Sequence, residues 1–376
     1  MSRVAVVGCG IVGAMIAYEL SLLTELEITV FDRQAPAQES TGAALGVLMG
    51  AISKKVKGRA WQLRQTSMQR YATLIPELEA LTGYQIPCNR QGILMLLLAG
   101  EDLNSWEKLA ETRHSQGWQL EIWDTAQIQS RCPQLNIEKL SAAIYSPQDR
   151  QVEPRILTHA LVAGAELRGV NFQFGTMVER VESVASDANS RRCHYLHTNA
   201  GKLEVDWLVI AAGLGSSQIT SLFSKSESSS LQKASTLPIK PVLGQALQLR
   251  LQQPIGHANF QPVITGNDVH ILPVGEGNYW VGATVEFPDQ GGEVVAEPAL
   301  LEQVRQEAIA FCPALAEAEI IRTWSGKRPR PEGQAAPVIG QLSGYDNVLL
   351  ATGHYRNGVL LAPATALAIR EAIAQA

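Results

Sequence analysis

The sequence has few cysteines, and none of them lies at a metal-binding spacing. Its five cysteines are odd in number and are scattered without any C-x-x-C pattern. Such a set does not form a complete disulfide framework and does not supply the paired thiolates of a zinc site. The pattern therefore predicts no metal and is typical of a reducing compartment, so we expect a cytoplasmic protein.

Charge is also sparse, and no block of lysines or arginines occurs. Charged residues make up 18% of the chain and the net charge is −5, which excludes the basic surface of a nucleic-acid-binding protein. A hydrophobic content of 46% is that of an ordinary globular protein. With 376 residues, the chain is long enough for two domains and a large core.

Long uninterrupted apolar runs are missing as well. The first 23 residues come nearest to a membrane anchor or a signal peptide, but three glycines and Glu19 interrupt them, and no small-residue cleavage site follows. We interpret this stretch as a buried strand followed by a helix, and we expect no stable membrane insertion.

A glycine motif stands between that strand and that helix. The apolar run Arg3–Val7 is followed by Gly8-Cys-Gly10-Ile-Val-Gly13, a G-x-G-x-x-G motif that opens an amphipathic helix. In such a unit the first glycine permits a tight turn, the second lets a pyrophosphate approach the backbone, and the third lets helix and strand pack closely. The helix N-terminus then faces the phosphates.

A second strand supports the same interpretation. Glu27–Phe31 leads into Asp32, where an acidic residue is expected to hold a ribose hydroxyl group. The strand, helix and acid together predict a dinucleotide site. The motif does not separate NAD from FAD, but the small residues of segment 39–48 favour a bulky, flat cofactor lying against the backbone.

The remaining patterns predict alternating helices and strands, with more strands in the middle of the chain. A Ser/Lys/Glu-rich stretch at 224–235 indicates a loop or linker. We therefore expect a discontinuous cofactor-binding domain and a second, β-rich domain inserted into it. The predicted cofactor-binding domain comprises 1–84, 145–236 and 326–376, and the predicted substrate-binding domain comprises 85–144 and 237–325.

Three motifs in this order resemble one known family. They are VVGCGIVGAMIA near the start, DWLVIAAGLGS at 206–216 and NVLLATGHYRNGVLLAPATA at 347–366. They are similar to the D-amino-acid-oxidase (DAO) family of FAD enzymes, most closely to its glycine oxidase branch, which is associated with thiamine biosynthesis. The resemblance implies an α/β fold with a Rossmann-type FAD-binding domain and an inserted β-rich α+β substrate domain.

The resemblance also implies a set of FAD contacts. No cysteine follows the final Gly-His and no histidine lies in 39–48, so we expect the FAD to be bound noncovalently. The implied cofactor-binding residues are Gly8, Gly10, Ile11, Val12, Gly13, Asp32, Arg33, Ser40, Thr41, Leu45, Gly46, Val47, Val178, Gly213, His354, Tyr355, Arg356, Asn357, Gly358, Val359 and Leu360.

Three residues are implied at the reacting end of the site. Arg328, in GKRP at 326–329, matches the arginine that clamps the substrate carboxylate, a role that suits the planar guanidinium fork. Arg356 matches a second arginine near the flavin ring. His270 replaces a tyrosine that helps hold the carboxylate in glycine oxidase, and Val285 replaces a methionine that borders the same pocket. Because of these two differences from glycine oxidase, the sequence does not identify the substrate.

The expected function is FAD-dependent oxidative deamination of a small amino acid or amine. Glycine, sarcosine or a small D-amino acid would give the imino or oxo acid, with O2 reduced to H2O2. Two alternatives stay open: a quinone-linked amino-acid dehydrogenase of the same fold, and a flavin-binding assembly factor without turnover. The expected partners are the substrate and O2, and a homo-oligomer is also left open.

Overall fold

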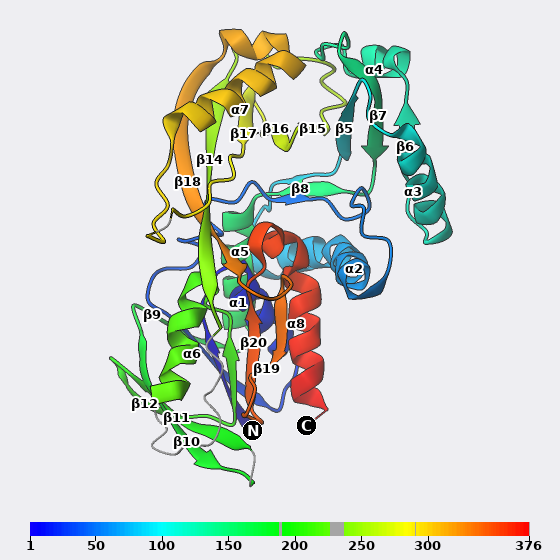
Figure 1. Ribbon diagram of the computed structural model, residues 1–376. Coiled ribbons are helices and arrows are strands. Elements are labelled where there is room, and N and C mark those ends of the chain that lie inside the picture. The colour runs from blue at the N-terminus through cyan, green and yellow to red at the C-terminus, as the bar shows by residue number, and fades with distance from the viewer. Residues whose placement is uncertain (188–189, 226–236, 290, 376) are drawn as a thin grey trace.

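The lower layer in Figure 1 is a six-stranded sheet with strand order β19-β20-β13-β1-β2-β9. β1 pairs in parallel with β2 and β13, and β19 is antiparallel to β20. Sheets of this kind are covered on both faces, which suits the continuous apolar strands of this layer. The strands are β1 (Ser2–Val7), β2 (Leu26–Asp32), β9 (Asn171–Phe174), β13 (Trp207–Ile210), β19 (Val338–Gln341) and β20 (Val348–Thr352).

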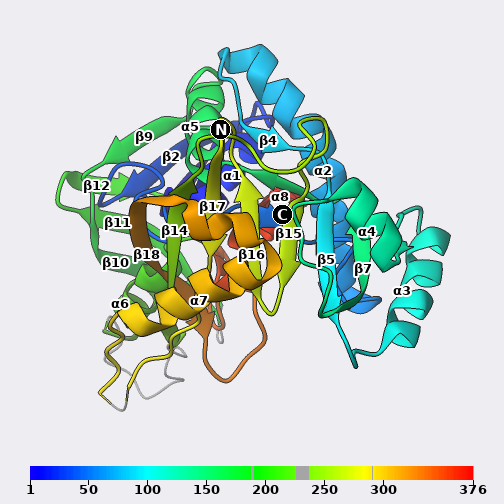
Figure 2. The same cartoon turned by 90° about the horizontal axis from the view of Figure 1, so that it is seen from above.

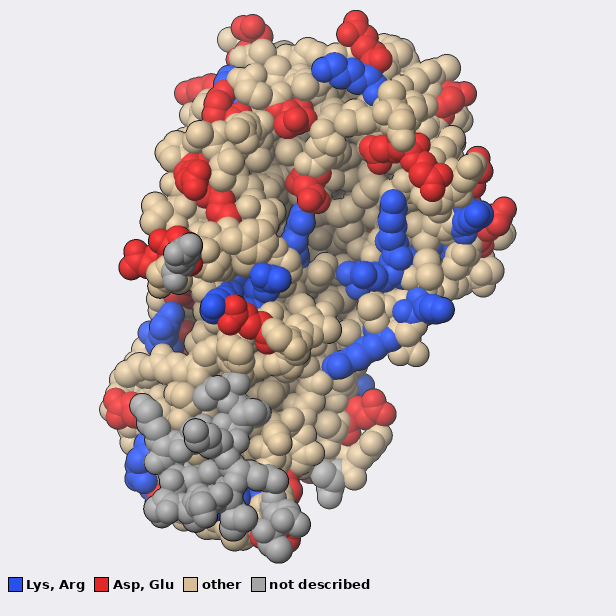
Figure 3. Space-filling view, viewed as in Figure 1, with Lys and Arg blue, Asp and Glu red and all other residues tan. Residues whose placement is uncertain are grey.

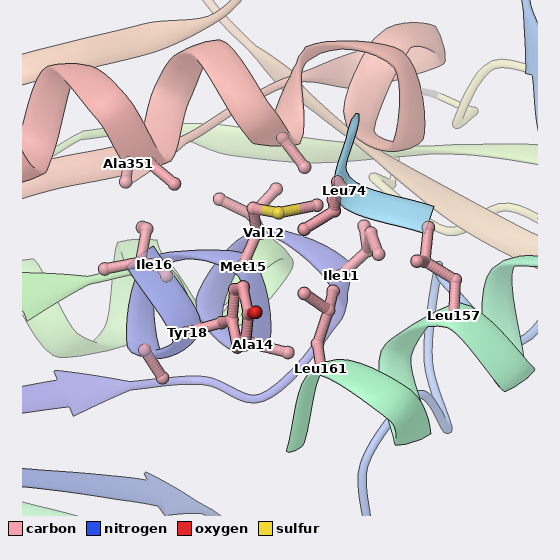
Figure 4. Packing of buried hydrophobic residues seen from close by; sticks show 14 of the residues in the cluster. Ile11, Val12, Ala14, Met15, Ile16, Tyr18, Leu74, Leu157, Leu161 and Ala351 are labelled. Carbon is pink, nitrogen blue, oxygen red and sulfur yellow. The ribbon is translucent and has the colours of Figure 1, made fainter. Parts of the chain in front are cut away.

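Helices cover one face of this sheet. All ten residues of α1 are buried, because α1 lies between the sheet and the neighbouring helices. Figure 4 shows Ile11 of α1 beside Leu157 and Leu161 of α5, within one large apolar cluster. The helices are α1 (Ile11–Leu20), α2 (Gly58–Thr82), α5 (Pro154–Glu166) and α8 (Gly358–Ala374).

The other face of the same sheet has its own apolar cluster. Val4 and Val6 of β1 belong to the helix-side cluster, whereas Ala5 and Val7 belong to the opposite one, as the two-residue period of a strand requires. The opposite cluster is completed by α6 (Ser216–Lys225) and by the small sheet β10 (Val178–Ala185), β11 (Arg191–Thr198) and β12 (Gly201–Glu204).

The upper layer is an eight-stranded sheet with order β18-β14-β17-β16-β15-β5-β7-β6. Helix α7 (Pro298–Phe311) packs on it through Val304, Ala308 and Phe311, and crosses it when seen from above (Figure 2). Helices α3 (Leu103–Ser115) and α4 (Thr125–Arg131) flank its far end. The strands are β5 (Ile93–Leu98), β6 (Glu121–Trp123), β7 (Leu140–Ser146), β14 (Ile239–Arg250), β15 (Val263–Gly266), β16 (Val269–Pro273), β17 (Asn278–Gly282) and β18 (Glu319–Pro331).

A small sheet and three short 3₁₀ turns complete the described part of the chain. Strand β8 (Arg150–Val152) runs between the two layers in Figure 1 and pairs with β3 (Val47–Leu48) and β4 (Cys88–Asn89). The 3₁₀ turns are η1 (Gly213–Gly215), η2 (Pro313–Glu317) and η3 (Tyr355–Asn357).

This computed structural model describes residues 1–187, 190–225, 237–289 and 291–375. The predicted loop or linker at 224–235 therefore lies outside the described residues from position 226 on. Within the described residues, no helix is long and apolar enough to cross a membrane, and no group of three or more metal-ligating side chains occurs.

The two layers confirm the α/β fold class expected from the sequence. The domain division stays a prediction, and two of its boundaries fall within strands. The boundary at 144/145 falls within β7, and the boundary at 325/326 falls within β18. Both strands are continuous across those positions because each is hydrogen-bonded to a neighbour on either side of the predicted break.

Candidate active site

A cavity of about 990 Å³ is lined by segments of both layers. This volume is at the upper end of the range for small-molecule and cofactor sites, roughly 300–1,000 Å³. Figure 3 shows that the face seen in Figure 1 is hollowed between the layers, with lysine and arginine side chains around the hollow. The size and the charge of this cavity suit a large, anionic ligand.

The glycine turn forms one wall of the cavity. Gly8 has a φ of +107°, which side chains other than glycine rarely adopt, and both Gly8 and Gly10 line the cavity. Gly13 does not line it: a Cβ atom there would lie 1.8 Å from the carbonyl oxygen of Gly8. Gly13 therefore serves the packing of α1 on β1, the role that its motif predicts, rather than direct contact with a ligand.

Asp32 fixes this turn. Its Oδ2 accepts a hydrogen bond from the backbone N–H of Cys9 at 2.6 Å, and its Oδ1 accepts one from the N–H of Gln34 at 2.9 Å. Each carboxylate oxygen can accept a further bond, so the predicted ribose contact remains available. Its neighbour Arg33 also lines the cavity but forms an exposed ion pair with Glu39 at 3.0 Å.

The predicted flavin-contacting segment 40–47 is held in place by β18. The Ser40 hydroxyl group donates to the carbonyl oxygen of Lys327 at 2.6 Å, and the Trp324 indole N–H donates to that of Ala43 at 3.1 Å. A Cβ atom on Gly326 would lie 2.3 Å from the Cβ of Ala43, so β18 can approach this segment only because residue 326 is glycine. The predicted residues Ser40, Thr41, Leu45, Gly46 and Val47 all line the cavity.

The segment Gly353–Leu360 forms the facing wall. His354 is buried and its Nε2 lies 2.9 Å from the Thr365 hydroxyl oxygen, while the Tyr71 hydroxyl group donates to the Val359 carbonyl at 2.6 Å. Helix α8 begins at Gly358, and no side chain caps it. Its first turn faces the cavity, where the positive end of the helix can stabilise negative charge on a ligand.

Arg328 projects from β18 into the cavity. Its guanidinium group lies over Gly244, where a Cβ atom would be 2.2 Å from Nη2. Nη1 donates to the carbonyl oxygens of Leu243 at 3.1 Å and Thr284 at 3.0 Å, and no ion pair involves Arg328 in the described part of the chain. Burial, and then the nearby Arg356 charge, lower the pKa of Arg328. The side chain is thus oriented by neutral carbonyls and forms no ion pair with an acidic residue of the described segments.

Arg356 differs, because it has an acidic partner. Asn267 and Asp268 form a two-residue turn with φ of 47° and 62° between β15 and β16. The Asp268 carboxylate lies 3.1 Å from Arg356 Nη2, and this guanidinium holds the pKa of Asp268 below its usual range. Sequence reasoning missed Asp268, although an Asn-Asp pair between two strands is a recognisable turn signal.

His270 lines the cavity from β16, between Thr265 and Gly282 on the neighbouring strands. Its Nδ1 is buried without a hydrogen-bond partner. Burial and then the Arg356 charge lower the pKa of His270 to about 4, so the ring is neutral at pH 7. Val285, expected near the same pocket, does not line the cavity, because the chain leaves β17 after Gly282 and bridges to Leu243 through Glu286.

The other residues predicted to contact FAD are also placed along the cavity. Val178 and Gly213 line it, and the residues that follow His354 line it as a continuous run. The remaining members are Ile11, Val12, Tyr355, Asn357 and Leu360.

A buried network that the sequence did not predict supports the wall beyond Val47. Arg113 of α3 is fully buried, and donates to the carbonyl oxygens of Ala51 at 2.6 Å and Ser53 at 2.6 Å. The Asp149 carboxylate accepts from the N–H groups of Gly50, Ala51 and Ile52, each at 2.8 Å. These contacts join residues far apart in the sequence, so no local pattern could reveal them.

Acid is expected to destabilise the fold through His354. Burial lowers the pKa of His354 to about 4, below the ordinary value of 6.5. The unfolded chain therefore binds the proton first as the pH falls, and the free energy of unfolding decreases between pH 6.5 and 4, by about 3 kcal/mol at most. Urea unfolding at pH 7.5 and 5.0 measures this decrease. His354→Asn should show a smaller decrease, and an equal decrease in both proteins would contradict the assignment.

Comparisons with known proteins agree with this geometry. The profile of the DAO family, described as FAD dependent oxidoreductase, matches residues 3–372. The bifunctional protein ThiO/ThiG of Nostoc sp. is 30% identical over 99% of this chain and 52% of its own length. The glycine oxidase of Geobacillus kaustophilus is 25% identical over 98% of this chain and 92% of its own length.

A solved structure shows the same architecture. The crystal structure of glycine oxidase from Geobacillus kaustophilus superposes with a TM-score of 0.83 at 25% identity, covering 100% of this chain and 95% of that one. The chain spans about half the length of the first curated relatives it matches, at 52%, 51% and 52% of their sequences. Because the family profile covers nearly all of its residues, this chain belongs to the DAO family of FAD-dependent oxidoreductases.

Proposed function

We propose that this protein uses FAD to oxidise a small amino acid or amine, such as glycine, sarcosine or a small D-amino acid. The amine loses two hydrogens to become an imine, and water hydrolyses the imine to the oxo acid and ammonia or a free amine. O2 accepts the two hydrogens and leaves as H2O2. The glycine oxidases among its relatives support this reaction class.

The cavity suits the family's cofactor. Gly10 lines the cavity without a side chain, so a ligand can approach its backbone closely. Gly46 also lines the cavity, but its missing Cβ makes room for the Val152 carbonyl oxygen, from which a Cβ atom would lie 1.8 Å. The N-terminus of α1 offers backbone N–H groups for a pyrophosphate, and Asp32 offers acceptors for a ribose. No cysteine lines the cavity in the described part of the chain, which supports noncovalent binding. When bound, FAD would supply the two-electron acceptor.

The observation that carries the proposal is that Arg328 faces the cavity without an acidic partner among the described residues. Its guanidinium is positioned by the Leu243 and Thr284 carbonyls and has no carboxylate partner within the described residues, although it faces the same cavity as the proposed flavin contacts. A partly buried cation of this kind is costly unless an anion joins it. A substrate carboxylate meets that need, because its two oxygens match the guanidinium fork.

His270 and Arg356 complete the proposed substrate end. The low pKa of His270 keeps its ring neutral at pH 7, so it adds no charge that would repel an amine. Arg356 is neutralised in part by Asp268, which leaves Arg328 as the stronger attraction for a carboxylate. The proposal therefore assigns carboxylate binding to Arg328 and the shaping of the adjacent pocket to His270.

Anaerobic mixing with amines tests this function. Glycine, sarcosine and D-alanine are each added to the FAD-loaded protein while the flavin absorbance near 450 nm is followed, and air is then admitted. We expect at least one amine to bleach the flavin, because the site binds it beside the oxidised cofactor. Peroxide should form once O2 enters, as an oxidase requires.

Other outcomes separate the alternatives. Bleaching without rapid reoxidation in air would favour the quinone-linked dehydrogenase. No bleaching by glycine, sarcosine, D-alanine or the two amines used below would contradict both enzyme readings and favour an assembly factor without turnover. The absorbance before mixing serves as the control for FAD content.

A further inference from the structure

Arg64 is a further arginine in the cavity wall, and it has no acidic partner in the described part of the chain. It lies in α2, and its Nη1 donates to the Ala60 carbonyl oxygen at 2.8 Å. Its Nε is buried without a hydrogen-bond partner. An arginine that is partly buried and unpaired in this way is costly, so its environment favours the arrival of an anion.

The nearby carboxylate of Asp149 does not serve as the anion that pairs with Arg64. Asp149 is the acidic group whose field acts on Arg64, but no ion pair joins the two side chains. Its Oδ1 accepts from the Gly50 and Ala51 N–H groups, and its Oδ2 accepts from the Ile52 N–H and the Ser146 hydroxyl group. Asp149 is thus committed to holding the backbone, and the charge of Arg64 remains available.

Arg64 lies next to a part of the cavity wall that follows the predicted flavin-contacting segment in the chain. The cavity wall continues from the segment Leu45–Val47 through Met49 and Ile52 to Lys54, and Asp149 and Arg113 hold this continuation beside Arg64. One turn further along α2, Met68 packs against Gly50, where an added Cβ atom would lie 1.9 Å from its sulfur. Arg64 is therefore assigned to the part of the cavity wall next to residues 50–54, whereas the phosphates and ribose of FAD are proposed at the glycine turn and Asp32.

This part of the wall combines an apolar surface with a second cation. Lys54 lines the cavity with its Nζ 4.7 Å from the Trp106 ring centre, and it has no ion pair among the described residues. Met49, Ile52 and Met95 supply apolar surface next to it. Such a surface accommodates an aliphatic chain, and the two cations favour an acid group at its end.

We propose that Arg64 and Lys54 bind a second acid group of the substrate, which makes the preferred substrate an amino- or imino-dicarboxylate. This inference rests on the proposed function: Arg328 takes the carboxylate next to the amine, and Arg64 takes the distal one. The planar guanidinium of Arg64 can hold both oxygens of that carboxylate, and Lys54 adds a point charge.

A matched pair of achiral amines tests the inference. N-ethylglycine has the same N-substituted glycine skeleton as iminodiacetate, with a methyl group in place of the second carboxylate. In anaerobic flavin bleaching, the half-saturating concentration should be at least about tenfold lower for iminodiacetate, as for a partly buried charge pair. Arg64→Leu should bring this ratio close to one. Arg59→Leu, an exposed arginine of the same helix that does not line the cavity, should keep it.

Several results would overturn the inference. They are equal half-saturation by the two amines in the unaltered protein, an unchanged preference in Arg64→Leu, and loss of bound FAD from Arg64→Leu, which would assign Arg64 to the cofactor. If Arg64→Leu does not fold, Lys54→Met at an exposed position provides the test and should also reduce the preference.

A binding measurement separates this inference from the proposed function. Succinate, which cannot be oxidised as an amine, should raise the Tm of the FAD-loaded protein more than butyrate does at equal ionic strength. Arg64→Leu should lose that difference. If no amine bleaches the flavin, the proposed function fails, and the succinate result alone then decides whether Arg64 binds a second carboxylate. Equal shifts by succinate and butyrate would count against it.

Discussion

Arg328→Ala is expected to leave bound FAD in place and to weaken substrate binding by about 2–5 kcal/mol, as for one partner of a buried charge pair. The guanidinium faces the cavity with no carboxylate of its own in the described residues, so a substrate carboxylate would lose its main partner. The measurement is the amine concentration for half-maximal flavin bleaching, together with the flavin absorbance of the purified variant.

Two further variants define what this result means. Arg328→Lys keeps the charge but loses the planar fork, so it should recover part of the binding. Arg330→Ala removes an exposed arginine from the same strand, one that stacks over Phe287 and does not line the main cavity, and it should bind substrate normally. Loss of FAD from Arg328→Ala, or equal losses in all three variants, would show that this arginine does not hold the substrate.

Gly13→Ala is expected to unfold or severely destabilise the protein, by roughly 3 kcal/mol or more. A Cβ atom at residue 13 would lie 1.8 Å from the Gly8 carbonyl oxygen and 2.9 Å from its carbonyl carbon, so backbone would have to move. Alanine has the higher helix propensity, but that gain of about 1 kcal/mol is too small to offset the clash. Urea unfolding of the protein without FAD measures the change.

Gly10→Ala is the matched control in the same motif. The nearest atom to its added Cβ would be the Thr41 hydroxyl oxygen at 3.1 Å, and this side chain can give way. Gly10 lines the cavity whereas Gly13 does not, so Gly10→Ala should fold but bind FAD more weakly. If Gly13→Ala were as stable as Gly10→Ala, the close contact of α1 with β1 would not depend on Gly13.

Local patterns predicted much of this architecture. The strand–glycine–helix unit at Arg3–Leu20 and the final strand and helix around Gly353 follow from neighbours in the sequence, because their periodicity and glycine placement are local properties. The helix after the glycine motif is shorter than predicted and ends at Leu20, since a turn closes there against Ala17.

Other features needed long-range contacts. Asp268 becomes the partner of Arg356 only because β15 and β16 bring the turn to the start of α8, 88 residues along the chain. No local sequence pattern predicts a role for Gly244, yet the pairing of β14 with β18 places it under the Arg328 guanidinium group. Val285 was expected at the pocket from its position in a motif, and the bridge from Glu286 to Leu243 keeps it off the cavity wall.

The sequence by itself determined the family and the fold class, and it predicted the stretch that a dinucleotide would meet, because each depends on residue order and spacing within short segments. Only the tertiary structure decided which charges in the cavity are already paired. Arg33 and Arg356 have acidic partners, whereas Arg328 and Arg64 have none among the described residues. Pairing depends on which side chains the fold brings within a few ångströms of each other, and no local sequence pattern predicts that distance.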